Sequence, residues 1–178
     1  MELIDALLDL CKDTRQPIIA IDGPAGAGKT TLADYLNLAI AQHYSIAVIH
    51  MDDLYDGWDN ALNSQLTEVL EHVTSAHKKS IPISLSTYDW NMGVFLPASQ
   101  LESAELLILE GVGSGQKAIR NSLSALIWID INEGEGMRRV IARDGIEIES
   151  HMRKWLATQE QHFHTQGTKN TADFVLTT

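Results

Sequence analysis

A glycine-rich segment at residues 23–30 has the residue types and spacing of a phosphate-binding loop. It reads GPAGAGKT and matches the pattern G-x-x-x-x-G-K-[ST]. Glycines let successive backbone N–H groups point inward around phosphate oxygens, Lys29 reaches the terminal phosphates, and the Thr30 hydroxyl binds Mg²⁺. The pattern therefore predicts a triphosphate site formed by Gly23, Ala25, Gly26, Ala27, Gly28, Lys29, Thr30 and Thr31.

Acidic side chains follow two other buried segments. Asp52 and three further aspartates, among them Asp59, come after residues 46–51, and Glu110 ends the run ELLILEG at 105–111. Carboxylates beside a phosphate loop can accept a proton from an attacking hydroxyl or hold the magnesium shell. Tyr55 and Trp58 in the first acidic stretch suggest a surface that receives a flat ring. The alternative is a solvated acidic loop, which is common in acidic proteins.

A third aromatic stretch, STYDWNMG, brings Tyr88 and Trp90 into residues 86–93, which show no clear periodicity. It fits either a substrate pocket or an ordinary loop with packed aromatic side chains.

Three arginines gather in the helical pattern at 133–143, namely Arg138, Arg139 and Arg143. Positions 139 and 143 are four apart and share a helix face. Guanidinium groups suit the charge that develops on a transferred phosphoryl group. The alternative is a solvated face on which they pair with neighbouring acids.

The elements that must position these residues alternate along the chain. Runs rich in Ile, Val and Leu at 17–22, 46–51, 105–111, 125–130 and 173–177 predict strands covered on both faces. Helical patterns occupy residues 28–42, 60–77, 133–143 and 148–164, and an amphipathic helix opens the chain. We therefore expect one α/β domain over 1–178 with a five-stranded parallel sheet, helices on both faces and a P-loop NTPase fold.

Composition narrows the functional classes. The 178 residues carry a net charge of −11, which disfavours nucleic-acid and anionic-membrane partners. No apolar run is long enough to span a bilayer. The single cysteine, Cys11, suits a reducing compartment, so we expect a cytoplasmic protein. The oligomeric state leaves no signal in the sequence.

In this order the motifs resemble the uridine kinase family of P-loop nucleoside kinases. The residues that carry the likeness are IDGPAGAGKTTLA, MDDLY, GWD, YDW, LILEGVGSG, IARD and QEQHF, from about residue 17 onward. The resemblance implies that Asp52 deprotonates the nucleoside hydroxyl and that Arg139 and Arg143 reach the phosphates from a short lid at about 133–147. It also implies a substrate pocket that contains Tyr55, Asp59, Tyr88 and Trp90.

Some positions depart from the family pattern. Gly136 stands where the family has a further lid arginine, and the β-hairpin between residues 78 and 92 looks shortened. Met92 and Gly93 stand near the place of the histidine that follows the Tyr-Asp-Phe segment of uridine/cytidine kinases.

Our leading hypothesis is an ATP- and Mg²⁺-dependent kinase that acts on a hydroxyl of a small acceptor, for which we expect a nucleoside. In it Thr30, Asp52 and Glu110 serve the metal, and Asp52, Lys29, Arg139 and Arg143 serve catalysis. The alternatives are a nucleoside monophosphate or other small-molecule kinase, and an ATP-binding regulator that hydrolyses ATP slowly.

Overall fold

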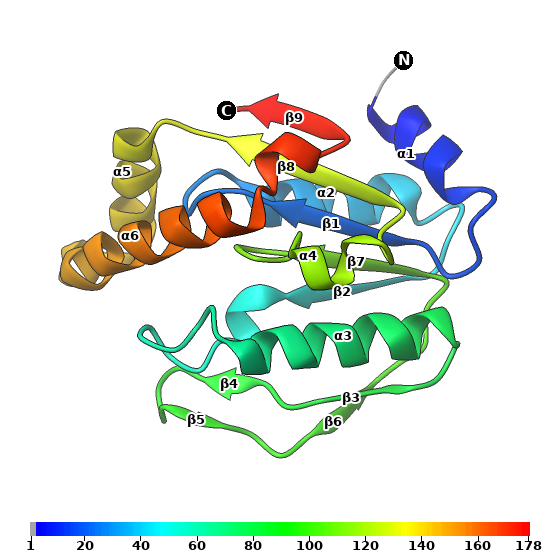
Figure 1. Ribbon diagram of the computed structural model, residues 1–178, viewed down its shortest axis with the longest axis horizontal. Coiled ribbons are helices and arrows are strands. Elements are labelled where there is room, and N and C mark those ends of the chain that lie inside the picture. Colours follow the sequence, from blue (N-terminus) through cyan, green and yellow to red (C-terminus); the bar gives the residue numbers. More distant parts are fainter. Residues whose placement is uncertain (1–2) are drawn as a thin grey trace.

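A five-stranded parallel sheet forms the centre of the protein, which the computed structural model describes for residues 3–178 (Figure 1). Its strand order is β2-β7-β1-β8-β9, with all neighbours parallel. The predicted α/β fold with a five-stranded parallel sheet is thereby confirmed. The strands are β1 (Ile18–Asp22), β2 (Ile46–His50), β7 (Leu106–Glu110), β8 (Ala125–Asp130) and β9 (Phe174–Thr177).

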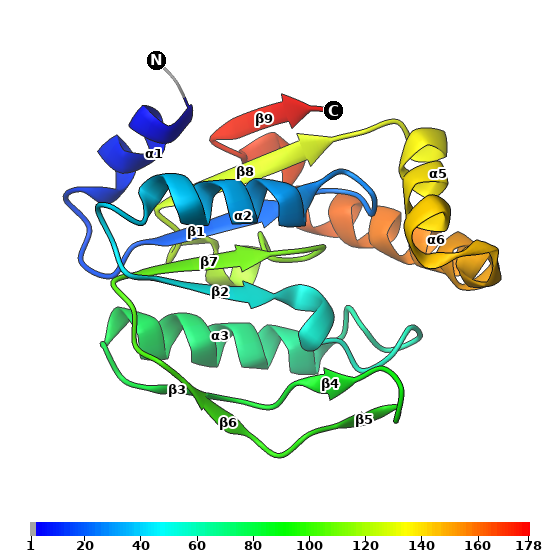
Figure 2. The same cartoon turned by 180° about the vertical axis from the view of Figure 1, so that it is seen from behind.

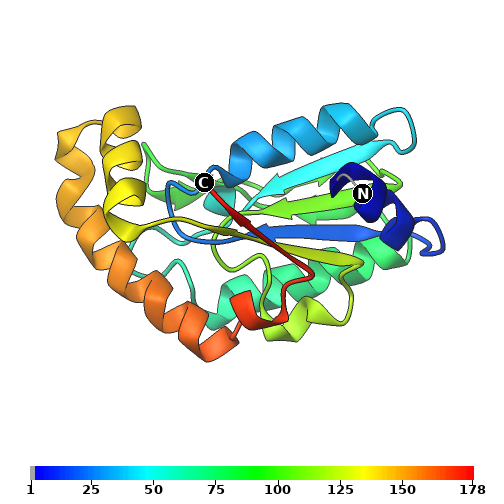
Figure 3. The same ribbon diagram turned by 90° about the horizontal axis from the view of Figure 1, so that it is seen from above.

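Helices cover both faces of this sheet, which is why the central strands are apolar on both sides. The helices α1 (Leu3–Cys11) and α2 (Lys29–Ile40) pack on one face with Ile19, Ile21 and Ile108. The other face carries Ile18, Leu107 and Leu109 under α3, α4 and α6. Helix α3 spans Ser64–Lys78, α4 spans Lys117–Arg120 and α6 spans Glu149–Gln166. Figures 2 and 3 show the helices on the two faces of the sheet.

The parallel register brings the chemical motifs to one edge. Ile21 lies opposite Glu110, and His50 lies opposite Glu110 from the other side. The phosphate loop after β1, the acidic turn η1 (Met51–Asp53) after β2 and the end of β7 therefore meet at the carboxyl ends of their strands.

An antiparallel arm lies beside α3 (Figure 1). In it β3 (Ile83–Leu85) pairs with β6 (Ser99–Leu101), and β4 (Tyr88–Asp89) pairs with β5 (Val94–Phe95). The arm extends to residue 101, beyond the shortened hairpin expected from the sequence. Strands of two or three residues are too short to show alternation, so the sequence pattern did not reveal them.

Two helices begin at a capping side chain. The α3 helix begins at Ser64 rather than at the expected residue 60, because the Asn63 side chain accepts a hydrogen bond from the N–H of Leu66. Asn132 caps α5 (Glu133–Asp144) in the same way through the N–H of Gly134. The turns η2 (Ile146–Ile148) and η3 (Lys169–Thr171) lie before α6 and β9.

The single domain and the lid at 133–147 stay predictions.

No helix among residues 3–178 has both the length and the apolar character that a membrane crossing requires.

The half-buried His162 of α6 predicts a pH dependence of stability. Burial lowers the pKa of His162 to about 4, and its Nε2 atom is buried without a hydrogen-bond partner in the described part of the chain. Between pH 6.5 and 4 the unfolded chain binds a proton there that the folded chain does not, so stability falls as pH falls through this window. We expect wild type to lose about 1 to 2 kcal/mol more than His162→Gln across it.

Urea unfolding of both proteins at a series of pH values measures this difference. Because the other titrating groups are common to both, parallel stability curves would contradict the prediction.

Candidate active site

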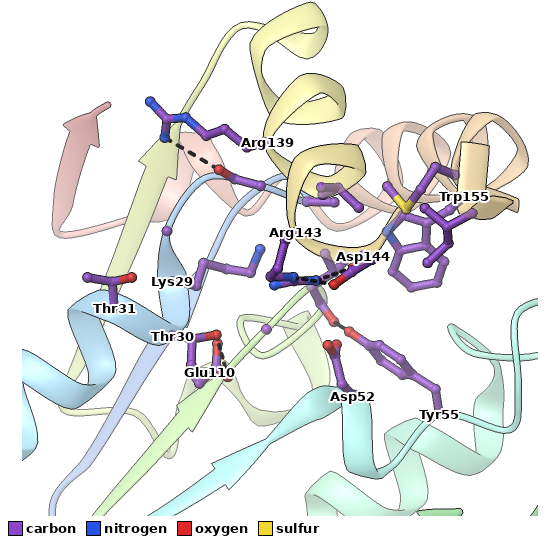
Figure 4. A pocket seen from close by; sticks show the side chains of 18 of the residues that line it. Lys29, Thr30, Thr31, Asp52, Tyr55, Glu110, Arg139, Arg143, Asp144 and Trp155 are labelled. Atoms are coloured by element: carbon purple, nitrogen blue, oxygen red, sulfur yellow. Dashed lines mark hydrogen bonds and ion pairs between the residues drawn. The ribbon is translucent and has the colours of Figure 1, made fainter. Parts of the chain in front are cut away.

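A cavity of about 440 Å³ opens at the carboxyl edge of the sheet (Figure 4). One end is lined by the phosphate loop and the start of α2, with Lys29, Thr30 and Thr31. Asp52 and Glu110 line its floor, and residues of α5, η2 and α6 close the other side. Most of the predicted site residues therefore meet in one cavity.

The phosphate loop has the backbone that its glycines predict. Gly26 and Gly28 adopt φ values of 78° and 90°, which glycine reaches without strain. Lys29 Nζ donates a hydrogen bond of 2.8 Å to the Pro24 carbonyl oxygen, so the ammonium lies folded against its own loop. Burial lowers the pKa of Lys29, and the nearby carboxylates of Asp22 and Asp52 oppose that shift.

Helix α5 packs directly against this loop through backbone alone. A Cβ at Gly136 would lie 2.6 Å from the Ala25 carbonyl oxygen, and one at Gly26 would lie 2.3 Å from the Gly136 carbonyl oxygen. Neither position accepts a side chain without separating the helix from the loop. Glycine at position 136 is thus a packing requirement.

Asp22, at the end of β1, was not identified from the sequence. Its carboxylate is fully buried and accepts hydrogen bonds from the N–H groups of Gly23, Gly113 and Gly115 at 2.8, 3.0 and 2.9 Å. Burial raises the pKa of Asp22, and the three amides oppose that rise. The side chain fastens the loop after β7 to the start of the phosphate loop.

Replacing Asp22 with alanine is expected to lower the free energy of unfolding by about 3 kcal/mol, because three buried amides lose their acceptor. Asp173 provides the control, since its carboxylate accepts one amide hydrogen bond, from Leu126, at a partly exposed site. Denaturant unfolding should give Asp173→Ala a loss of about 1 kcal/mol. Equal losses in the two variants would contradict the assigned role.

Thr30 and Glu110 offer two oxygen ligands for a metal ion beside the phosphate loop. The Thr30 hydroxyl donates to Glu110 Oε1 at 3.2 Å, and the same Glu110 oxygen contacts His50 Nδ1. Hydroxyl and carboxylate oxygens are the donors that Mg²⁺ prefers. The residues present therefore fit a magnesium ion held between Thr30 and Glu110.

The Asp52 carboxylate faces the cavity between Glu110 and Tyr55 (Figure 4). Burial raises the pKa of Asp52, and the charge of Lys29 opposes that rise. Within residues 3–178 the structure gives this carboxylate no hydrogen-bond partner. Asp52 is thus available to a bound molecule.

The three arginines of α5 differ in placement. Arg143 pairs with Asp144 at 2.7 Å and points toward Lys29 and Asp52, whereas the Arg139 guanidinium points away from them (Figure 4). Arg139 binds Glu135 at 2.9 Å and reaches the Gly26 carbonyl oxygen at 3.5 Å. Arg138 is exposed and pairs with Glu135. Arg143 is therefore the arginine best placed toward the cavity.

Aromatic rings form the cavity wall opposite the phosphate loop. Trp58 makes edge contacts with Trp90 at 5.3 Å and with Trp155 at 6.1 Å, and Tyr55 packs on Trp155 at 5.2 Å between ring centroids. The Tyr55 hydroxyl donates to the Val112 carbonyl, and Trp90 Nε1 donates to the Asp52 carbonyl. Both rings are thereby fixed in place.

Four predicted residues lie outside the cavity lining. Asp59 is exposed, and Gly23 and Ala27 are buried within the loop. Tyr88 contacts Trp90, with the ring centroids 5.1 Å apart, but does not line the cavity. The structure instead adds Asp144, Met152 and Trp155 to the lining. The spacing of Met152 and Trp155 within the predicted helix at 148–164 was the available signal for the last two.

Known proteins with similar sequences include several uridine kinases. That of Lactobacillus helveticus is 27% identical, with 89% of this chain and 85% of the relative covered. That of Lactobacillus johnsonii is 25% identical, with 91% and 86% covered.

Solved structures share the fold. A possible uridine kinase from Bacillus stearothermophilus superposes with a TM-score of 0.67 at 22% identity, covering 99% of this chain and 100% of the other. A candidate fructose transport system kinase from Silicibacter sp. TM1040 gives 0.71 at 15% identity, covering 98% of each chain.

The matches with known proteins confirm the predicted resemblance to the uridine kinase family and the prediction that the chain is a kinase. A family model described as an AAA domain matches residues 19–158, most of the chain. The chain therefore belongs to this AAA domain family of P-loop proteins.

Proposed function

We propose that the protein is an ATP- and Mg²⁺-dependent kinase that transfers the γ-phosphoryl group of ATP to a hydroxyl of a nucleoside. The observation that carries the proposal is the free Asp52 carboxylate, which faces the same cavity as Lys29 and the phosphate loop. A general base must reach the hydroxyl that attacks phosphorus, and Asp52 has no other partner in the described chain.

The loop amides of residues 23–31 would hold the phosphates, and Thr30 with Glu110 would hold Mg²⁺. Lys29 leaves the Pro24 carbonyl and neutralises charge on the transferred group, and Arg143 approaches the same group from α5, the proposed lid. Asp52 accepts the proton of the attacking hydroxyl. Mg²⁺, when bound, shields the negative charge of the phosphates from the incoming oxygen.

The lining supports an uncharged acceptor with a flat ring. Trp58, Trp90 and Trp155 line the cavity, and rings of this kind suit contact with a flat ligand. One face of Trp58 is stacked on His151, with the ring centroids 5.5 Å apart. The basic side chains among the described lining residues are Lys29, Arg139 and Arg143, all on the phosphate loop and on α5. An acceptor that carried its own phosphate would find no further cation there, which disfavours a nucleoside monophosphate. The single cysteine suits a reaction in the cytoplasm.

The test is incubation of the purified protein with ATP, Mg²⁺ and each of the common ribo- and deoxyribonucleosides, followed by mass spectrometry of the products. We expect a nucleoside 5′-monophosphate and an equal amount of ADP. A reaction without acceptor measures hydrolysis alone.

Folded protein that binds ATP but phosphorylates none of the nucleosides would overturn the proposal. Slow ADP release that no acceptor accelerates would instead favour an ATP-binding regulator.

A further inference from the structure

One residue of α6 reaches the phosphate loop from outside the cavity. The Ala25 N–H donates a hydrogen bond of 3.0 Å to Gln159 Oε1. Gln159 is only 5% exposed and does not itself line the cavity. A buried amide side chain that holds a loop N–H fixes the orientation of that peptide unit.

The same face of α6 contributes Trp155 to the aromatic wall. Met152, Trp155 and Gln159 are the buried residues of this helix, and their spacings of three and four place them in one row. Trp155 lines the cavity and packs on Tyr55 and Trp58. A shift of α6 along or around its axis therefore moves the aromatic wall and the partner of the Ala25 amide together.

The loop has little freedom to absorb such a shift. The backbone of Gly136 lies against Ala25 and Gly26 on the α5 side, and Gln159 holds the Ala25 amide on the α6 side. Close-packed contacts of this kind transmit small displacements instead of dissipating them.

We propose that Gln159 is a positioning residue that couples the aromatic half of the cavity to the phosphate loop, so that a ligand in either half favours binding in the other. The inference rests on the proposed function for the identity of the two ligands. The coupling itself requires only that the loop binds a triphosphate. Such coupling is reciprocal, so it can be measured from the nucleotide side alone.

The experiment titrates the protein with the ATP analogue adenosine 5′-(β,γ-imido)triphosphate and Mg²⁺, following tryptophan fluorescence and, separately, the heat of binding. Wild type should show a fluorescence change, because the loop displaces α6 and alters the surroundings of Trp155. A Trp155→Phe variant identifies the part of the signal that this ring supplies. Two variants break the hydrogen bond from the Ala25 N–H: Gln159→Met removes the acceptor at similar volume, and Gln159→Asn draws the acceptor oxygen back by one methylene.

Both variants should still bind the analogue but show at most about half of the wild-type fluorescence change. Gln159→Glu keeps an oxygen at the same position and should retain the response. Gln161→Met is the matched control, because Gln161 is exposed on the same helix and should behave as wild type. If a nucleoside is turned over, it should tighten analogue binding at least about fivefold in wild type and less than about twofold in Gln159→Asn.

The two proposals fail in different ways. Full fluorescence changes in folded Gln159→Met or Gln159→Asn would overturn the coupling and leave the kinase intact. If the analogue binds and the fluorescence changes differ between wild type and the Gln159 variants as expected, but no nucleoside is phosphorylated, the kinase proposal alone is overturned. Wild type that binds no analogue would overturn both.

Discussion

Replacing Lys29 with methionine is expected to lower kcat/KM for phosphoryl transfer about 1000-fold. The substitution keeps the length of the side chain and removes the ammonium group that lies at the phosphate end of the cavity. In the free protein this group donates to the Pro24 carbonyl, an interaction that a phosphate oxygen replaces at little cost. Steady-state assays with ATP and the best nucleoside measure the loss.

Lys79→Met is the matched control, because Lys79 is exposed at the end of α3. It should retain full activity. A loss smaller than about threefold in the Lys29 variant would show that the ammonium does not stabilise the transition state.

Replacing Asp52 with asparagine is expected to lower kcat about 1000-fold while the affinity for the ATP analogue stays within about twofold. Asparagine has nearly the same shape and cannot accept the proton of the acceptor hydroxyl. Because the Asp52 carboxylate makes no hydrogen bond to the described chain, the substitution should leave the fold unperturbed. Single-turnover measurements of product formation, with parallel binding titrations, separate the two effects.

Asp53 supplies the control at the neighbouring position of η1, where an exposed carboxylate can be changed to asparagine. That variant should transfer phosphate at the wild-type rate. Unchanged product formation in Asp52→Asn would show that Asp52 is not the general base.

The phosphate loop and the sheet could be predicted from the sequence because their signals are local. The loop needs glycines and a lysine at fixed spacing within eight consecutive residues, from Gly23 to Thr30. The strands are buried on both faces, so each is a continuous apolar run. Since parallel strands end at one edge, Asp52 and Glu110 could be placed near the loop before their positions were known.

The remaining parts of the site depend on tertiary contacts. Asp22 accepts amides that lie 91 and 93 positions further along the chain, and Gln159 meets Ala25 across 134 positions. No local pattern encodes such pairs. Asp59 matched a family motif in sequence, but its side chain is exposed and lies outside the cavity. The family motifs therefore predicted the position of the phosphate-binding and acidic residues, but they did not predict which side chains line the acceptor half of the cavity.

The backbone contact between Gly26 and Gly136 limits which substitutions this lineage can accumulate. An arginine at position 136 would place its Cβ 2.6 Å from the Ala25 carbonyl oxygen, so this position cannot take a cationic side chain while α5 lies where it does. An arginine at position 136 would require α5 to move away from the phosphate loop, and that movement alone would loosen the loop. A further cation added to this cavity by design must therefore come from another segment.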